Sequence, residues 1–127
     1  MGFFYSFLTS LLISLHLVGE IPYSGLESAF SDNNPSGIVN YGKDKILINV
    51  LGTEGVYSQS QASLVLKDFF NKKPNSSFKF IFKGKETPEG SFAIGNYISK
   101  GESFRVTIQF KKNGTDFKIE SLTIEKA

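Results

Sequence analysis

Few side chains in this chain of 127 residues could perform acid–base chemistry near neutral pH. The one histidine, His16, lies in the apolar N-terminal stretch, and there is no cysteine. General acid–base catalysis would therefore depend on a carboxyl group with a shifted pKa. Asp44 and Asp68 stand beside lysines and Asp116 follows a turn motif, which indicates solvated side chains. Glu120, near a predicted irregularity in the last strand, is the remaining candidate acid, although a surface position is the favoured interpretation.

Sequence motifs for catalysis and for cofactor binding are also missing. The chain has no nucleophile-elbow, zinc-protease or phosphate-cradling pattern, and without cysteine it offers neither a thiolate zinc site nor thiol chemistry. The sequence therefore predicts no catalytic residue, no metal and no cofactor. A carboxylate-dependent lyase or isomerase is kept as the least favoured alternative.

Tyrosine and asparagine side chains are the better candidates for binding a ligand. A tyrosine combines an apolar body with a polar tip, which suits the mouth of a pocket. We therefore select Tyr57, Asn96 and Tyr97 as candidate ligand-binding residues. Asn96 is the one polar residue on the bulkier face of its strand, and pointing inward it would need a hydrogen-bonding partner. The opposite orientation, with Tyr97 buried and Asn96 in water, is slightly favoured because asparagine is usually exposed.

Basic residues occupy alternate positions of the predicted strands. Such a stripe could bind nucleic acid or an anionic surface, but Thr107 and Gln109 interrupt it and no aromatic residue is interleaved with it. Lysines also protect strand edges from pairing, so a solvated face is favoured and no nucleic-acid partner is predicted. The residues concerned are Lys79, Lys83, Lys85, Arg105, Lys111 and Lys118.

Residues 1–19 have the composition of a secretory signal peptide. They contain no Asp, Glu, Lys or Arg and are rich in leucine, which suits the apolar region of such a leader. The run falls short of the roughly 20 apolar residues of a membrane-spanning helix. We expect cleavage after Gly19, a periplasmic or secreted location and no stable membrane span; an uncleaved anchor and a core helix are the alternatives. N-terminal sequencing of exported protein, expected to begin at Glu20, tests this.

The remaining single domain, residues 20–127, is predicted to contain two helices. Pro22 suits a first helical turn, and apolar spacing continues that helix over 22–32. A cluster of helix-breaking residues over 31–37 predicts a loop. Ser58 and Gln61 form a capping-box pattern at the start of a second helix, 58–72. The apolar stripe of this helix comprises Ala62, Val65, Leu66 and Phe69.

Alternation of apolar and polar residues predicts a sheet for most of the rest. Asn113-Gly114 predicts a hairpin, a parity slip indicates a bulge near Glu120–Ser121, and 52–55 is expected to be a turn. The inward phenylalanines include Phe82, whose truncation to alanine would cost about 3–5 kcal/mol if the ring is central. The predicted fold class is α+β, with helices packed on a curved antiparallel sheet. The strands are predicted over 45–51, 78–83, 91–99, 104–111 and 117–124.

Short motifs are distributed along most of the chain. They are Ile21-Pro22, Gly25-Leu26, Ala29-Phe30, Gly55-Val-Tyr-Ser58, Gln61-Ala62, Leu66-Lys-Asp-Phe-Phe70, Phe78-Lys-Phe80, Lys83-Gly84, Phe92-Ala-Ile-Gly95 and Phe104-Arg-Val106. Over residues 20–125 this succession resembles an uncharacterised family of exported bacterial proteins, mostly from bacteroidetes. That family is classed as a domain of unknown function in the nuclear transport factor two-like (cystatin-like) superfamily. The resemblance implies a conical fold, sometimes with a pocket between the helices and a bent sheet, and it implies no activity. A histidine that often precedes the Lys-Gly pair is replaced here by Phe82.

These observations predict a non-catalytic module that binds a small molecule inside the cone. The alternative is a structural or protein-interaction domain that acts as a homodimer or with a partner docked on its sheet. A deep pocket with inward polar groups would favour the first function. An exposed apolar patch over a filled cone would favour the second.

Overall fold

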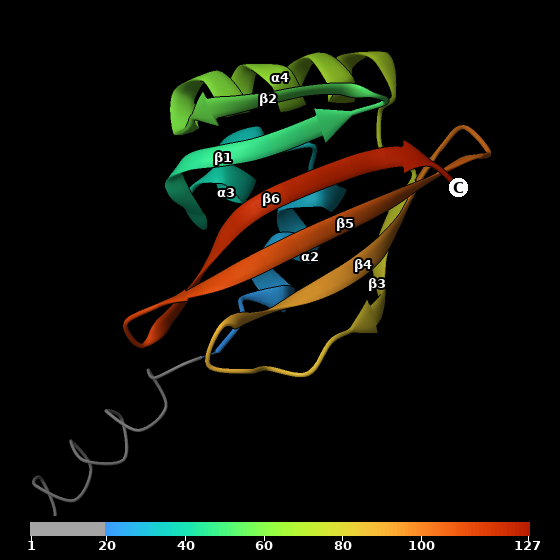
Figure 1. The fold of residues 1–127 in the computed structure, drawn as a ribbon. Coiled ribbons are helices and arrows are strands. Elements are labelled where there is room, and N and C mark those ends of the chain that lie inside the picture. The colour runs from blue at the N-terminus through green and yellow to red at the C-terminus, as the bar shows by residue number, and fades with distance from the viewer. Residues whose placement is uncertain (1–19) are drawn as a thin grey trace, which may run out of the picture.

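The helices and strands of the domain follow local signals in the sequence. The computed structural model describes residues 20–127 (Figure 1), so the leader predicted over 1–19 lies outside the described residues and stays a prediction. Among the described helices, none is long and apolar enough to cross a membrane. The elements are α2 (Tyr23–Ser31), α3 (Pro35–Val39), β1 (Gly42–Val50), β2 (Thr53–Ser58), α4 (Gln59–Lys72), β3 (Ser77–Lys83), β4 (Gly90–Ser99), β5 (Glu102–Asn113) and β6 (Asp116–Lys126).

Helix α4 begins at the predicted capping box. The Ser58 hydroxyl accepts a hydrogen bond from the Gln61 N–H at 3.3 Å, and the Gln61 side chain accepts one from the Ser58 N–H at 3.2 Å. These reciprocal bonds fix the first turn of the helix. Ala62, Leu66 and Phe69 are buried on its inner side, which confirms most of the predicted apolar stripe.

Helix α3 corrects the prediction of a loop over 31–37. Pro35 occupies its first turn, and the Asn34 side chain accepts a hydrogen bond from the Gly37 N–H at 3.2 Å. Asparagine and proline break helices internally but favour a helix start. The residues that indicated a loop therefore cap a short helix, in which Ile38 and Val39 are buried.

Strand β2 corrects the prediction of a turn over 52–55. The loop of the β1–β2 hairpin consists of Leu51-Gly52 alone, with φ angles of 51° and 93°, so it is a tight two-residue turn. The hairpin predicted at Asn113-Gly114 is confirmed. Its loop is Gly114-Thr115, one residue later than the motif suggests, because the closing pair joins Asn113 to Asp116.

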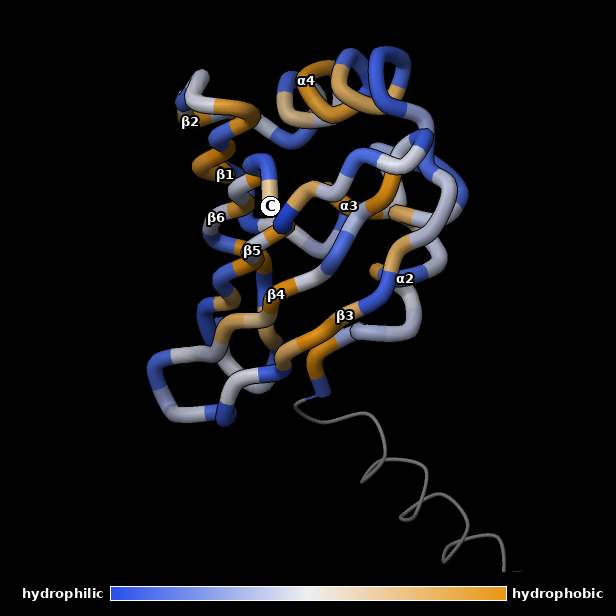
Figure 2. The backbone as a smooth tube through the Cα atoms, turned by 90° about the vertical axis from the view of Figure 1, so that its right-hand side faces the viewer, coloured by the Kyte–Doolittle hydropathy of each residue, from blue (hydrophilic) through white to orange (hydrophobic). Residues whose placement is uncertain are grey.

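One curved sheet of six strands forms the centre of the domain, in the order β2-β1-β6-β5-β4-β3. Its neighbouring strands are antiparallel except for β1 and β6, which are parallel. The predicted α+β class is confirmed, and the one parallel pair was not predicted. Helices α2 and α3 lie on the inner face of the sheet, and α4 covers the end formed by β1 and β2 (Figures 1 and 2). We call the opposite, helix-free face the outer face.

A bulge in β6 confirms the predicted parity slip. Gln109 of β5 pairs with Ser121, and the next residue, Phe110, pairs with Ile119. Glu120 is therefore the extra residue. Because of this residue, the apolar side chains on both sides of the bulge, Ile119 and Leu122 among them, are buried.

A second bulge, in β3, was not predicted. Phe80 pairs with Gly95, but Phe82 pairs with Ile94, so Ile81 is the extra residue. The bulge reverses the alternation that follows it. Phe82 consequently lies on the outer face, 47% exposed, and its predicted inward position is wrong. Lys83 turns to the inner face and leaves the predicted basic stripe.

Aromatic side chains fill the space between the sheet and the helices. Phe30 of α2 stacks on Phe78 of β3 with ring centroids 4.4 Å apart, and Phe69 of α4 meets Phe104 edge-on at 5.4 Å. All four are buried. Apolar and polar residues alternate along the strands (Figure 2), as a sheet with one covered face requires.

Candidate ligand-binding cleft

A cleft of about 540 Å³ opens between helix α4 and the β1–β2 hairpin. Its size falls within the range of roughly 300–1,000 Å³ that small-molecule sites occupy. Most of its wall is apolar, and the polar groups gather toward the C-terminal end of α4. The lining residues are Val50, Leu51, Thr53, Tyr57, Leu64, Val65, Asp68, Phe69, Lys72 and Lys73.

Tyr57 forms the wall that strand β2 contributes. It pairs with Ile46 of β1, whose side chain is buried on the inner face, so the alternation of β2 turns Tyr57 inward. The ring lies over Gly55, where an added Cβ would stand 2.6 Å from the Tyr57 hydroxyl oxygen. The missing side chain at Gly55 therefore provides the space for this ring.

Helix α4 contributes the opposite wall and its charged rim. Val65 and Phe69 are one turn apart and present apolar surface to the cleft. Asp68 and Lys72, also one turn apart, form an ion pair of 3.0 Å at the exposed edge. The α4 wall thus combines an apolar interior with a rim that can orient a charged or polar group.

Lys73 ties the far end of the cleft to the sheet. Its Nζ donates a hydrogen bond to Glu102 Oε1 at 2.8 Å and lies 5.9 Å from the centroid of the Phe104 ring. Glu102 also pairs with Lys126 at 3.1 Å. Hydrogen bonds from Lys73 and then Lys126 lower the pKa of the Glu102 carboxyl, so this carboxylate is ionised at neutral pH.

The three predicted ligand-binding residues are not brought together. Tyr57 lines the cleft, whereas Asn96 lies on the outer face opposite Lys79 and Arg105. Tyr97 is fully buried. The favoured orientation of this strand, with Tyr97 inward and Asn96 outward, is confirmed.

The hydroxyl group of Tyr97 belongs to the core. It donates a hydrogen bond to the Lys73 carbonyl at 2.5 Å and accepts one from the Asn33 side chain at 2.9 Å. Burial raises the pKa of Tyr97, and the bond from Asn33 acts in the opposite direction. Because Asn33 also accepts a bond from the Asn75 N–H, Tyr97 joins the end of α2 to the end of α4.

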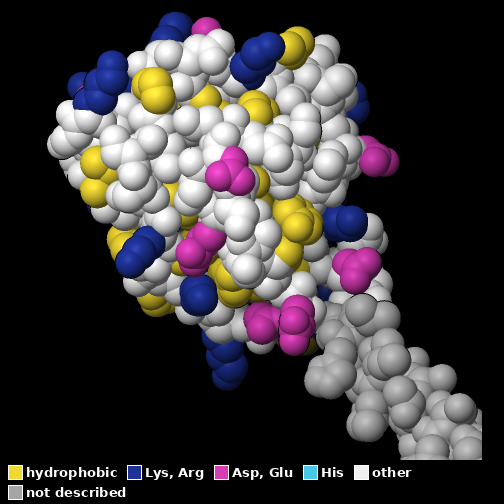
Figure 3. Space-filling view, turned by 180° about the vertical axis from the view of Figure 1, so that it is seen from behind, with side chains coloured by type: hydrophobic (Ala, Val, Ile, Leu, Met, Phe, Trp, Pro, Cys, Tyr) yellow, Lys and Arg dark blue, Asp and Glu magenta, His cyan; other side chains and the backbone are white. Residues whose placement is uncertain are grey.

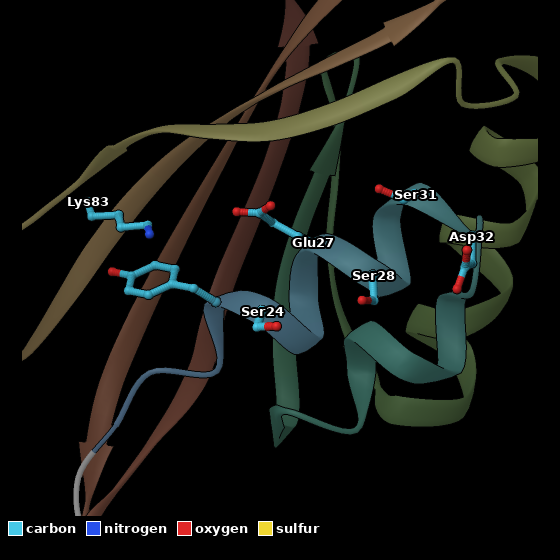
Figure 4. Close-up of a pocket in the computed structure, with 7 residues that line it drawn as sticks. Ser24, Glu27, Ser28, Ser31, Asp32 and Lys83 are labelled. Atoms are coloured by element: carbon cyan, nitrogen blue, oxygen red, sulfur yellow. The ribbon is translucent and has the colours of Figure 1, made fainter.

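A second groove, of about 520 Å³, runs along α2. Lys83 faces it because of the β3 bulge, with its Nζ 4.7 Å from the centroid of the Tyr23 ring. Burial and then the charge of Glu86 raise the pKa of Tyr23. Hydroxyl and carboxylate groups of α2 and of its C-cap residue line the rest, so the groove offers little apolar surface (Figure 4). Those side chains are Ser24, Glu27, Ser28, Ser31 and Asp32.

The candidate acid Glu120 lies at the surface. It is the bulged residue of β6, and its carboxylate pairs with Lys43 at 3.5 Å and with Lys111 at 3.8 Å. Among residues 20–127, no group of three or more His, Cys, Asp or Glu side chains is placed to hold a metal ion. Across the helix side of the molecule, charged side chains are scattered among small apolar areas (Figure 3).

The curved sheet with helices on one face defines an α+β cone of the cystatin-like and nuclear transport factor two-like class. A protein with a cystatin-like fold from Nostoc punctiforme superposes with a TM-score of 0.64 at 10% identity, covering 82% of this chain and 72% of that one. A domain of unknown function, DUF4783, matches residues 23–125, and the chain belongs to this family. This confirms the predicted resemblance to a domain-of-unknown-function family with a cystatin-like fold.

Solved members of the DUF4783 family share the fold closely. The protein from Bacteroides ovatus is 29% identical, with a TM-score of 0.77, and the match covers 85% of this chain and 96% of that one. The protein from Bacteroides uniformis is 25% identical, with a TM-score of 0.77 and coverage of 85% and 98%. No curated protein matches the chain.

Proposed function

We propose that this domain is a non-catalytic module that binds a small molecule in the cleft between α4 and the β1–β2 hairpin. The observation that carries the proposal is the lining of this cleft, where apolar side chains from three elements surround about 540 Å³ and charged groups stand only at its rim. Ligand sites are typically apolar cavities with a few convergent polar groups. The α2 groove, with its hydroxyl and carboxylate lining, lacks this combination.

The cleft suits a ligand with an apolar body and one polar or anionic end. Tyr57, Val65 and Phe69 would contact the body, and Lys72 would face the polar end. The ammonium of Lys72 is exposed and shared with Asp68, so an anionic group could compete for it at little cost in desolvation. Lys73 is engaged by Glu102 and holds the wall in place.

Catalysis by a carboxylate is the less favoured function. Asp68 is the acidic residue that lines the cleft, and it is exposed and paired with Lys72. A general acid or base is normally desolvated, which shifts its pKa toward neutrality. Asp68 is better suited to orient Lys72 than to transfer a proton.

Fluorescence titration with anilinonaphthalene sulfonate tests the proposal, since this probe has an apolar body and one anionic group. We expect Tyr57→Ala to raise the dissociation constant about tenfold, which corresponds to about 1.4 kcal/mol, because the variant removes one wall. Gly55→Ala should act in the same direction by displacing the Tyr57 ring.

The matched control is Tyr41→Ala. Tyr41 is also half-buried and its ring also lies over a glycine, Gly25, but it stands outside the cleft. This variant should lose stability without losing affinity for the probe. Equal losses of affinity in the variants of Tyr41 and Tyr57, or no loss in Tyr57→Ala, would contradict the proposal.

A further inference from the structure

The turn between β1 and β2 holds a leucine in a backbone conformation that leucine rarely adopts. Leu51 and Gly52 have φ angles of 51° and 93°, so both lie in the left-handed region, as a type I′ turn requires. Asparagine, aspartate and glycine are the usual residues at the first of these positions, and a bulky side chain there is strained. Strained residues of this kind gather at functional sites, where another gain offsets their cost. The turn alone does not explain a leucine at position 51.

Hydrogen bonds on both sides hold this turn in place. The Leu51 N–H donates to the Ile124 carbonyl of β6 at 2.8 Å, and the Gly52 N–H donates to the Asn49 side chain at 3.0 Å. The backbone of Leu51 is thus tied to the neighbouring strand as well as to its own turn. The side chain of Leu51 therefore leaves the sheet in a fixed direction.

The Leu51 side chain stands at the boundary between two hollows. It lines the cleft between α4 and the β1–β2 hairpin, and it also lines a second hollow of about 390 Å³ with Gly52, Glu125 and Lys126. The side chain is 47% exposed. About half of its apolar surface is therefore left for a bound molecule to cover.

Leu51 lies at the charged end of the cleft. Lys73, which lines the cleft, and Lys126, which lines the second hollow, are joined through Glu102 by ion pairs of 2.8 Å and 3.1 Å. The turn lies at the same end of the molecule as the C-terminal end of α4, where Lys72 stands (Figure 1). An apolar side chain among these charged groups can cover the part of a ligand that adjoins its polar end.

We propose that Leu51 is a specificity-determining residue of the cleft, whose side chain closes over the apolar part of the ligand next to its anionic group. This inference rests on the function proposed above for the cleft. It restricts the ligands to molecules in which the anionic group is attached directly to a bulky apolar group, as in an aromatic acid, and disfavours those with a polar linker between the two. The strained turn is the means by which the hairpin presents an apolar side chain at this point.

The β4–β5 hairpin offers a matched control for the strain. Its loop, Lys100-Gly101, has φ angles of 50° and 82° and therefore the same turn type. Neither residue lines the cleft. Asparagine tolerates this conformation better than lysine, so Lys100→Asn should raise the melting temperature by about 4 °C or more. It should leave the affinity for a probe bound in the cleft unchanged.

Fluorescence titrations of protein produced from the full chain, with two probes, test the proposal. Anilinonaphthalene sulfonate carries its anionic group directly on the ring, whereas a polar linker separates the carboxylate of dansylglycine from its ring. Leu51→Asn should raise the dissociation constant of the first probe about fivefold, as expected for half the burial of a leucine, and that of the second less than about twofold. Leu51→Met keeps the apolar surface and should stay within about twofold of the wild type for both probes.

Thermal unfolding separates this role from a structural one. Leu51→Asn relieves the same strain as Lys100→Asn, so its melting temperature should be at or above that of the wild type. A melting temperature lower by more than about 4 °C, an equal loss of affinity for both probes, or an unchanged affinity for anilinonaphthalene sulfonate would overturn the proposal. A wild type that binds neither probe, or whose binding Tyr57→Ala does not weaken, would instead overturn the proposed function of the cleft and with it the role of Leu51.

Discussion

Phe82 and Phe104 have the same side chain in different surroundings, so a comparison of the two shows how burial alone affects stability. Phe104 of β5 is fully buried and its ring packs against Phe69 of α4, whereas Phe82 is half exposed on the outer face. Removing a buried phenylalanine leaves a cavity, while removing an exposed one leaves little.

We therefore expect Phe104→Ala to lower the free energy of unfolding by about 3–5 kcal/mol and Phe82→Ala to lower it by about 1 kcal/mol or less. Urea denaturation of both variants against the wild type measures the difference. A comparable loss in the two variants would contradict the outer position of Phe82 and the bulge at Ile81.

Residue types indicated the two faces of β4 and only slightly favoured the one that is buried. Alternation places Ala93, Gly95 and Tyr97 on one face of the strand. The other face carries Phe92, Ile94, Asn96 and Ile98, and both sets are apolar enough to face a core. The deciding contact is long-range: an added Cβ on Gly95 would lie within 2.4 Å of the Phe78 ring. Gly95 must therefore lie beneath Phe78, and this follows from the pairing of β3 with β4 rather than from the residues of β4 alone.

At the scale of the element, helix α4 depends on its first turn. Ser58 and Gln61 exchange two hydrogen bonds there, and the cleft wall formed by Val65 and Phe69 follows directly. We expect Ser58→Ala to lower the free energy of unfolding by about 1 kcal/mol. Ser63→Ala, inside the same helix and without a capping bond, should be neutral or slightly stabilising. Thermal unfolding of both variants measures this, and equal losses would argue against the capping box as the start of α4.

The two bulges show what an element's own sequence can and cannot indicate. In β6 the buried set changes parity between Ile119 and Leu122, so the extra residue at Glu120 is visible in the sequence. In β3 the phenylalanines at 78, 80 and 82 keep a period of two, and the apolar run Phe80-Ile81-Phe82 does not show which residue is extra. The bulge at Ile81 is decided by the pairing with β4, which also sends Lys83 inward to Tyr23.

At the scale of the whole molecule, the cleft results from a long-range connection. The β1–β2 hairpin joins the sheet because β1 lies parallel to the last strand, β6, and the Leu51 N–H donates to the Ile124 carbonyl at 2.8 Å. Local patterns predicted α4 and the fold class, but not β2 or the parallel pairing. Tyr57 was therefore a candidate by its chemistry, while the wall to which it belongs could not be predicted.

The central claim is that the cleft between α4 and the β1–β2 hairpin binds a small amphipathic molecule. Proton–nitrogen correlation spectra recorded during a titration with anilinonaphthalene sulfonate locate the bound probe directly. The account predicts that the amide signals which shift belong to residues 50–57 and 64–73, with the largest changes near Tyr57 and Val65. Shifts confined to the α2 groove or to the outer face of the sheet, or no shifts at saturating probe, would contradict it.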